Sequence, residues 1–248
     1  MKIATWNVNG IRARQAQVHE WIEKEQPDVL CLQEIKATPE QVPAMLCELE
    51  GYWCYWHGGP KGYSGVGLHV RKEFCADRPL FQHPEFDFEN RIVTAQIADV
   101  TIASIYVPNG GKDFPAKMRF LKAMDAYAQG FIEMEKPIVL CGDINIARAE
   151  MDVHPKERNP NVTGQSPEER AWFEQLLARG LVDVGRTFDP DNEGLFTWWA
   201  PWRNMRARNI GWRLDYILAS EALARTARSC EVRAAFGTSD HAPVVAEF

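Results

Sequence analysis

The sequence lacks the marks of several classes of protein. No apolar run approaches the ~20 residues that a membrane span needs, so we expect no membrane insertion. Low-complexity stretches, short repeats and linkers are missing, which excludes fibrous and disordered classes. A Gly-rich phosphate-binding loop and a Ser/His nucleophile elbow are missing too, which argues against nucleoside-triphosphate use and acyl transfer. The first residues form no long apolar signal region, so we expect a cytoplasmic protein.

Positive charge is also in short supply. The 248 residues include 28 Lys and Arg against 34 Asp and Glu, which gives a net charge of −6. This balance argues against a surface that binds any polyanion, although a local basic face remains compatible with it. The six cysteines form no Cys-x-x-Cys pair. We therefore expect buried free thiols in a reducing compartment rather than disulfides.

Short apolar runs rich in β-branched residues predict strands buried in a layered α/β fold. These runs cover residues 3–8, 29–32, 66–70, 92–107 with a break near Asp99, 138–144, 216–218 and 243–248. Apolar periodicity and capping boxes predict helices around 18–22, over 38–51, over 118–131 and over 166–180. The length fits one domain over residues 1–248. Two long segments, 147–165 and 189–211, show no regular pattern, and irregular segments of this length are usually functional or mobile.

The ends of the predicted strands have an unusual set of polar residues. This set is Asn7, Asn9, Glu34, Tyr106, Asp143, Asn145, and Asp240 with His241 before the last strand. Residues two apart on a strand share a face, so Asn7 and Asn9 should point together, as should Asp143 and Asn145. In open α/β sheets the ligand crevice lies beyond the carboxyl ends of the strands. The combined pattern predicts one composite site, although each residue alone is as typical of a turn or a solvated surface.

Carboxylate and amide oxygens without a Cys/His cluster favour a hard cation, Mg²⁺ with Mn²⁺ as an alternative. Together with the Asp240-His241 pair, this oxygen set suits metal-assisted hydrolysis of a phosphate ester. A second pattern follows at 197–213, where three tryptophans precede four arginines with no acid among them. Such a segment suits phosphate contacts and stacking on nucleotides. The alternative is that the tryptophans pack a core and the arginines form a solvated rim.

Seven segments together resemble the exonuclease III family of abasic-site endonucleases, within the endonuclease/exonuclease/phosphatase superfamily. The segments are WNVNGIR at 6–12, LQEIK at 32–36, GYSGVG at 62–67, YVPN at 106–109, GDIN at 142–145, GWRLDY at 211–216 and SDHAP at 239–243. The resemblance covers the whole chain. It implies a four-layered α/β sandwich, in which two mixed sheets pack face to face and helices flank them.

The resemblance also implies an activity. It implies Mg²⁺-dependent cleavage of double-stranded DNA on the 5′ side of an abasic site, which leaves a 3′-hydroxyl. Related members trim blocked 3′ ends as a phosphodiesterase or phosphatase, and some digest duplex DNA from 3′ to 5′. We expect a monomer that acts in DNA repair in a bacterial-type cytoplasm and associates with the nucleoid when it does so.

By resemblance, each polar residue has a role. Glu34 is the principal metal ligand, and Asn7, Asp143, Asn145, Asp240 and His241 complete the metal site. His241 contacts the scissile phosphate or deprotonates the nucleophile, and Asp215 orients it. Asp143 handles the proton of the attacking water or of the leaving group. Asn145 and Tyr106 hydrogen-bond the phosphate oxygens.

The DNA-binding residues implied by resemblance are Lys112, Trp198, Trp202, Arg206, Arg208, Trp212 and Leu214. Of these, Trp198, Trp212 and Leu214 would line a pocket for the flipped-out abasic sugar. Trp202 stands where relatives insert a wedge into the minor groove. Lys112 stands where some relatives insert an Arg into the major groove, and a compact ammonium should hold the product less firmly.

Two departures and two alternatives accompany the resemblance. Asn9 stands where some relatives have Asp, so a second tightly held metal is less expected, and segment 152–165 matches the DNA-contacting loop of the family poorly apart from Asn159-Pro160. One alternative is a phosphoesterase of the same superfamily that acts on lipids, inositol phosphates or RNA tails, which GYSGVG and WRLD oppose. The other is a non-catalytic DNA-binding or scaffold paralogue, which would usually have lost a metal ligand or the histidine.

Overall fold

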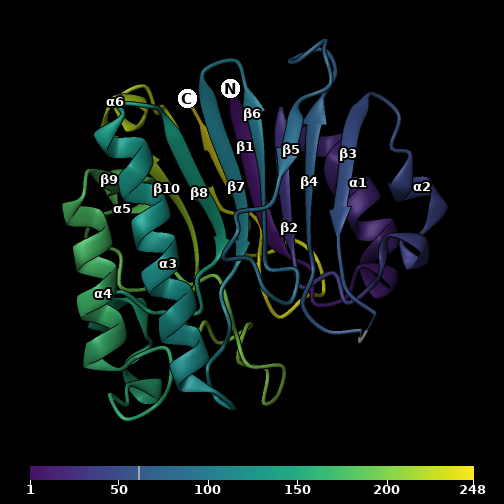
Figure 1. The fold of residues 1–248 in the computed structure, drawn as a ribbon. Coiled ribbons are helices and arrows are strands. Elements are labelled where there is room, and N and C mark those ends of the chain that lie inside the picture. Colours follow the sequence, from purple (N-terminus) through teal and green to yellow (C-terminus); the bar gives the residue numbers. More distant parts are fainter. Residues whose placement is uncertain (61) are drawn as a thin grey trace.

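The fold consists of two mixed six-stranded sheets that pack against each other, seen in a computed structural model that describes residues 1–60 and 62–248 (Figure 1). The first sheet has the order β11 (Ser229–Val232), β12 (Val244–Glu247), β1 (Lys2–Asn7), β2 (Val29–Gln33), β4 (Val66–Arg71) and β3 (Tyr52–His57). The second has the order β5 (Leu80–Gln82), β6 (Ile92–Ile97), β7 (Val100–Tyr106), β8 (Ile138–Asp143), β10 (Asp215–Ser220) and β9 (Leu181–Asp183).

The two sheets repeat one pattern of pairing. Each contains one parallel pair, β1 with β2 in the first sheet and β7 with β8 in the second, and the other neighbours are antiparallel. Strand β1 therefore has the same place in its sheet as β8 has in the other. The downstream ends of these two strands lie at the same end of the molecule, where both sheets can supply side chains to one site.

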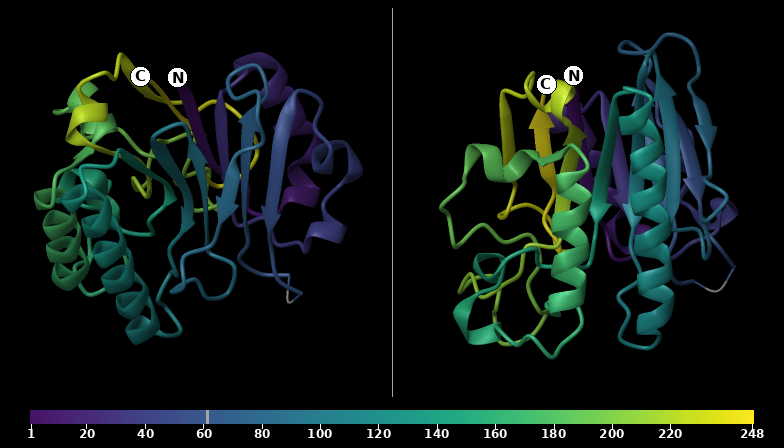
Figure 2. Two further views of the ribbon diagram at one scale, coloured as in Figure 1. Left: turned by 45° about the horizontal axis from the view of Figure 1, so that its top comes forward. Right: turned by 60° about the vertical axis from the view of Figure 1, so that its left-hand side comes forward.

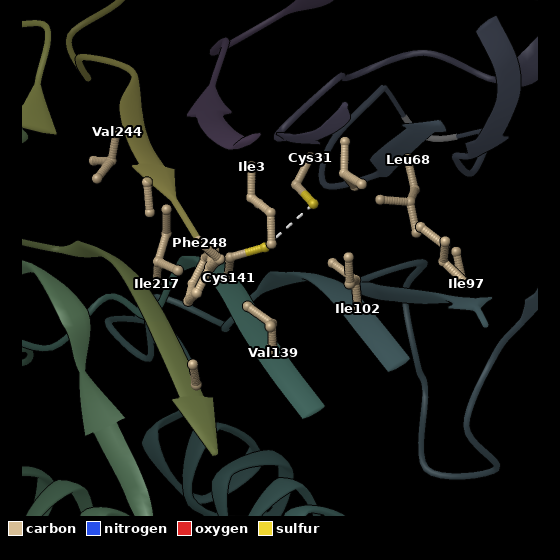
Figure 3. Packing of buried hydrophobic residues seen from close by; sticks show 14 of the residues in the cluster. Ile3, Cys31, Leu68, Ile97, Ile102, Val139, Cys141, Ile217, Val244 and Phe248 are labelled. Atoms are coloured by element: carbon tan, nitrogen blue, oxygen red, sulfur yellow. Dashed lines mark hydrogen bonds between the residues drawn. The ribbon is translucent and has the colours of Figure 1, made fainter. Parts of the chain in front are cut away.

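The core between the sheets is apolar and contains two thiols. Ile3, Leu68, Ile102, Val139 and Ile217 are among the buried residues of this layer (Figure 3). The Sγ atoms of Cys31 on β2 and Cys141 on β8 lie 3.2 Å apart across it. All six cysteines are free thiols, as expected, but only Cys31, Cys141 and Cys230 are buried. The expectation that every thiol is buried is wrong for the other three, which are half-buried: Cys47 in α2, Cys54 on β3 and Cys75 in a connection.

Helices cover the outer faces of both sheets, which completes the expected four-layered sandwich (Figures 1 and 2). Helix α1 (Gln15–Glu25) and the short α2 (Ala44–Cys47) cover the first sheet, and α3 (Phe114–Glu133) and α4 (Pro167–Ala178) cover the second. The remaining helical turns are α5 (Val184–Phe188), α6 (Glu221–Ala224), and the 3₁₀ turns η1 (Ile11–Arg14), η2 (Pro39–Gln41), η3 (Glu150–Asp152) and η4 (Pro155–Glu157). The predicted capping box at Ser166 is present, and its hydroxyl accepts a hydrogen bond from the amide of Glu169.

The helix predicted over 38–51 is wrong in extent. The capping box at Thr38 forms, but it starts only the turn η2, and α2 covers four residues. Pro43 explains the break, because a residue before proline is pushed to an extended conformation, and Val42 has φ −67° and ψ 134°. Strands β3, β5, β9 and β11 were not predicted, since three are short and the aromatic β3 shows no alternation.

The termini and the predicted site lie at opposite ends of the sandwich. The N-terminal amine of Met1 donates to the carbonyl of Phe248 over 2.9 Å, and the long loops 144–166 and 189–214 gather at the other end (Figure 2). Among the described residues, we find no helix that combines the length and the apolar character needed to cross a membrane.

Candidate active site

Polar residues from both sheets meet at the downstream ends of β1 and β8. Asn7 is fully buried at the end of β1 and reaches across the joint between the sheets. Its Nδ2 donates to Asp143 Oδ2 at the end of β8 over 2.8 Å and to Glu34 Oε2 after β2 over 3.0 Å. The structure thus brings together residues separated by 136 positions in the chain, and the predicted composite site exists as one cluster.

The two residues at these strand ends form equivalent turns. The amide of Asn9 donates to Asn7 Oδ1, and the amide of Asn145 donates to Asp143 Oδ1, each over 2.9 Å. Asn9 and Asn145 have left-handed φ values of 45° and 54°, which asparagine tolerates well. The expectation that each pair shares one strand face is therefore wrong: the strands end at Asn7 and Asp143, and the turns bring the second asparagine back to the cluster.

His241 lies between two carboxylates. Its Nδ1 is 2.8 Å from Asp215 Oδ2 at the start of β10, and its Nε2 is 3.8 Å from Asp143 Oδ2. Burial alone would lower the pKa of His241, but the two carboxylates outweigh burial and raise it to about 10. The imidazole is therefore charged at neutral pH, and Nε2 is a proton donor that faces the cluster.

Asp143 is the acid of the cluster with a pKa near neutrality. Burial raises the pKa of this carboxyl to about 7, opposed by His241 and reinforced by the charge of Asp215. A carboxyl group with this pKa can exchange a proton with water near pH 7, as general acid–base chemistry requires. Asp215 Oδ1 is buried and has no hydrogen-bond partner among the residues that the structure describes, so this carboxylate keeps one free acceptor.

A second group of side-chain oxygens lies beside this cluster, around the half-buried Glu34. Lys36 Nζ lies 2.9 Å from Glu34 Oε1 and 2.6 Å from Asn9 Oδ1. Asn9 Nδ2 donates to Asp240 Oδ1 over 2.7 Å. The position of the Lys36 ammonium indicates that these oxygens are arranged to meet a cation, and their chemistry fits a hard divalent ion. Ligand atoms of Asp143, Asp215 and His241 also lie within 4.8 Å of one another.

Tyr106 forms another wall of the cluster. Burial and the charge of Glu34 raise its pKa well above the usual tyrosine value, so the phenol keeps its proton. The guanidinium of Arg91 lies over the Tyr106 ring, 4.9 Å from its centroid, and Glu89 binds the same guanidinium. The sequence patterns did not single out Arg91, because its contact with the Tyr106 ring forms only when β6 and β7 pair as antiparallel strands.

Trp198, Trp212 and Leu214 lie together, as the resemblance implied. The two indole rings meet edge to face at 5.6 Å, and Leu214 is buried against them. Trp198 also borders the catalytic cluster, because its Nε1 donates to Asp240 Oδ2 over 3.0 Å. Trp212 Nε1 is buried and has no acceptor within the described part of the chain. A cluster of Trp198, Trp212 and Leu214 therefore adjoins the acidic cluster directly.

The arginines of segment 203–213 do not form the uniform basic patch that was expected. Arg213 is buried and forms ion pairs with Asp152 at 2.7 Å and Asp183 at 2.6 Å. Arg206 donates to the carbonyls of Phe236 and Ser239 over 2.8 and 2.7 Å. Both side chains hold loops in place, so the basic face at this segment is smaller than the sequence suggested.

Three of the residues predicted to contact DNA are exposed. Lys112, Trp202 and Arg208 are exposed, and the Trp202 side chain leaves 59% of its surface free. A cavity of about 360 Å³ runs from Asn9 and Asp240 to Arg14 and Arg203. Two arginines, Arg14 and Arg203, thus line a cavity that reaches Asn9 and Asp240 of the site.

Sequence reasoning missed several residues that hold the site together. Thr197 is buried, and its hydroxyl accepts hydrogen bonds from the amides of Leu214 and Asp215 over 2.9 and 3.0 Å. Lys117, on α3, donates to the carbonyl of Asn145. No local pattern reveals such residues, because their partners are distant in the chain.

Comparison with known proteins supports a nuclease site. Residues 4–241 match the Endonuclease/Exonuclease/phosphatase family. The chain is 36% identical over 252 residues to recombination repair protein 1 of Drosophila melanogaster, covering 100% of this chain but only 37% of that protein. It is 35% identical over 250 residues to an exodeoxyribonuclease of Bacillus subtilis, covering 98% of each.

Solved structures are similar over the whole chain. The 3′ phosphatase NExo from Neisseria, bound to a product DNA hairpin, has a TM-score of 0.89 at 33% identity, and the match covers 100% of this chain and 99% of that one. An AP endonuclease from Archaeoglobus fulgidus has a TM-score of 0.88 at 31% identity, with the same coverage.

Proposed function

The chain belongs to the endonuclease/exonuclease/phosphatase family, and on this basis we propose that it is a DNA repair nuclease. It hydrolyses the phosphodiester on the 5′ side of an abasic site in double-stranded DNA and leaves a 3′-hydroxyl. The observation that carries this proposal is the contact between the sheets, where Asn7, Asp143 and His241 form one polar cluster beside the aromatic side chains of Trp198 and Trp212. Similarity to an exodeoxyribonuclease and to an AP endonuclease supports the substrate.

A divalent cation completes the site. Glu34 would be its principal ligand, and the nearby oxygen atoms of Asn7, Asp143, Asn145 and Asp240 would form the rest of its surroundings, with the charged His241 beside them as a hydrogen-bond donor. The oxygen-rich donor set and the ammonium held by Glu34 and Asn9 support this assignment. When bound, Mg²⁺ or Mn²⁺ would supply positive charge that offsets the charge on the scissile phosphate.

The protein side chains divide the remaining tasks. Asp143, with its pKa near 7, accepts the proton of the attacking water. As the water oxygen bonds to phosphorus, the bond from phosphorus to the 3′-oxygen breaks, and that oxygen takes a proton from solvent to become the 3′-hydroxyl. The charged His241, oriented by Asp215, donates from Nε2 to a phosphate oxygen. Asn145 and Tyr106 donate to the other oxygens, where negative charge increases in the transition state. In this division Asp143 acts as a proton acceptor and His241 as a hydrogen-bond donor, which agrees with the pKa of each group.

The aromatic pocket selects the lesion. Trp198, Trp212 and Leu214 form an apolar enclosure that suits a deoxyribose without its base, and flipping is least costly where no base pair has to be broken. Trp202 inserts at the lesion, and the exposed Lys112 and Arg208 lie along the DNA backbone, whereas Arg206 holds the neighbouring loop in place. We also infer activity on blocked 3′ ends, which similarity to a 3′ phosphatase supports. Residues 1–248 act as one domain and as a monomer in the cytoplasm.

Three duplexes test the proposal directly. One contains a single abasic site, one ends in a 3′-phosphate and one is intact and blunt, and each is incubated with Mg²⁺ or with EDTA. We expect cleavage of the abasic duplex and dephosphorylation of the second, both only with Mg²⁺. Cleavage that survives chelation would disprove the metal dependence. Hydrolysis of a phospholipid or of poly(A), without cleavage of the abasic duplex, would assign the chain to another branch of the superfamily.

A further inference from the structure

A fully buried ion pair lies behind the active site, between the two helices that cover the second sheet. Lys117 of α3 and Glu169 of α4 each have 0% of their side chain exposed, and Lys117 Nζ is 2.5 Å from Glu169 Oε1. The helices lie side by side in both views (Figures 1 and 2). A buried ion pair often stabilises a fold no better than apolar residues of the same volume. The hydrogen bonds that this pair makes to the loops around the site therefore indicate another role.

The ammonium of Lys117 connects both loops that follow β7 and β8. Its Nζ donates to the carbonyl of Asn145 over 2.7 Å and to the carbonyl of Asn109 over 3.2 Å, in addition to Glu169. An ammonium has three N–H groups, so all three have acceptors. The fit is close, because a Cβ on Gly110 would lie only 2.7 Å from Lys117 Cδ.

Glu169 connects a third segment, around Gly164, to the Lys117 ammonium. Its two carboxylate oxygens accept the amide of Gly164 over 2.9 and 2.8 Å, and Oε2 also accepts the hydroxyl of Ser166 over 2.6 Å. Gly164 in turn accepts the amide of Ala147 through its carbonyl over 2.8 Å. Loops 107–111, 145–147 and 164–166 are therefore fixed to one another through two buried charges.

Asn145 is the active-site residue at the centre of this arrangement. Its amide donates to Asp143 Oδ1, and its side-chain Nδ2 donates to the carbonyl of Val107 over 2.9 Å and to Asp143 Oδ2 over 3.2 Å, so donation to a phosphate oxygen would replace the longer of these two bonds. Its backbone is left-handed, with φ 54°, and its carbonyl points to the helix α3 side, where Lys117 Nζ lies 2.7 Å away. Lys117 is the group that binds that carbonyl.

We propose that Lys117, held by Glu169, is a positioning residue that fixes the Asn145 side chain for the transferring phosphate. The proposal rests on the proposed function, in which Asn145 donates to the phosphate. Because the pair lies behind the loops and is inaccessible to substrate, it acts on turnover rather than on DNA affinity.

Kinetics of charge-free variants test the proposal. Lys117→Met leaves Glu169 buried and unpaired, so Lys117→Met/Glu169→Gln, which removes both charges, provides a second variant that can fold. Displacing a group that acts in the transition state lowers kcat and leaves KM nearly unchanged. We expect kcat on the abasic duplex to fall about 10- to 100-fold, with KM within about threefold of wild type.

The matched control breaks another ion pair between the same two helices. Arg179 Nη2 lies 3.1 Å from Asp125 Oδ2, eight residues further along α3 than Lys117. Asp125→Asn should lower the melting temperature without lowering kcat. An equal loss of kcat in the control would show that the effect of Lys117 is general loosening of α3 and α4, and would overturn the proposal.

A double-mutant cycle shows whether the pair acts through Asn145. In an Asn145→Ala background no side chain remains to be positioned, so the charge-free variant should lower kcat by less than about threefold. The same 10- to 100-fold loss in both backgrounds would overturn the proposal.

Amide hydrogen exchange separates this inference from the proposed function. We expect the amides of Asn145 and Ala147 to exchange at least about tenfold faster in Lys117→Met/Glu169→Gln than in wild type, and at the wild-type rate in Asp125→Asn. Absence of cleavage by the wild type would disprove the function alone, whereas unchanged exchange in the charge-free variant would disprove the positioning role whatever the substrate.

Discussion

At the scale of single residues, two buried histidines show how neighbouring charge decides a protonation state. His69 on β4 is buried without a carboxylate, and burial lowers its pKa to about 3. His241 is equally buried, yet Asp215 and Asp143 outweigh burial and raise its pKa to about 10. The same side chain is thus neutral in the core and charged in the active site, where a donor to phosphate is needed.

NMR of histidine side chains in the cation-free protein checks this assignment. His241 should keep its proton until about pH 10, and Asp215→Asn should lower its pKa because burial then meets one carboxylate fewer. The raised pKa also affects stability. The contribution of His241 to the free energy of unfolding is complete below the unfolded pKa of about 6.5 and disappears as the pH rises to about 10. Titration of wild-type His241 near 6.5 would contradict the assignment.

Removal of the two proton-carrying groups should abolish most turnover. We expect Asp143→Ala or His241→Ala to lower kcat on the abasic duplex by about two to four orders of magnitude, because each removes a group that acts on the reacting atoms. Circular dichroism should show an unchanged fold. Glu221→Gln, which breaks the exposed pair with Arg225 on α6, is the control and should keep the wild-type rate. A wild-type rate in either active-site variant would disprove its role.

At the scale of elements, buried charges rather than strands hold the loops around the site. Arg213 and Arg186 both bind Asp152 of η3, and Arg213 also binds Asp183 at the end of β9. This network fixes the segment that includes Trp212, Leu214 and Asp215. Loop 144–166 thus has a defined position although it contains only 3₁₀ turns.

Asp152→Ala should therefore be strongly destabilising. It leaves two buried guanidinium groups without a shared partner, and breaking a buried pair costs about 3–5 kcal/mol. Urea unfolding followed by fluorescence measures this loss, and the exposed Glu221→Gln serves again as the reference. A change in Asp152→Ala no larger than that of the reference variant would contradict the structural role of the network.

The elements also show what the sequence could predict. Runs of β-branched residues located eight strands, and the capping box at Ser166 located α4, because both signals are local. The fate of Arg213 was not predictable, since its burial depends on Asp183, 30 positions away. Asn7 and Asp143 were placed in one site from strand-end polarity, but the turns that bring Asn9 and Asn145 to it depend on a left-handed backbone that the sequence pattern does not reveal.

At the scale of the whole molecule, the net charge of −6 is compatible with DNA binding, because we expect the cations that contact DNA to be confined to the face around the site. Of the four arginines of segment 203–213, Arg213 and Arg206 are occupied within the fold, so Arg203 and Arg208 remain in this segment to contact phosphates. In EDTA, which prevents cleavage, we expect the plot of log Kd against log salt concentration to have a slope of magnitude below about 5. Arg208→Ala should reduce this slope by about 1.

The control for the salt dependence lies at the other end of the sandwich. Arg225 follows α6, near the termini (Figure 1), and Arg225→Ala should leave the slope unchanged. A wild-type slope near 10, or an equal effect of Arg225→Ala and Arg208→Ala, would show that binding is spread over the surface and not confined to the face around the site.

The most direct test of the central claim is to map the cut in a duplex that contains one abasic site and a 5′-label on the damaged strand. With Mg²⁺, we expect a single labelled product that ends immediately 5′ to the lesion and has a 3′-hydroxyl that a polymerase can extend. A labelled product cut on the 3′ side of the lesion, or an intact strand under conditions in which the protein is folded, would contradict it.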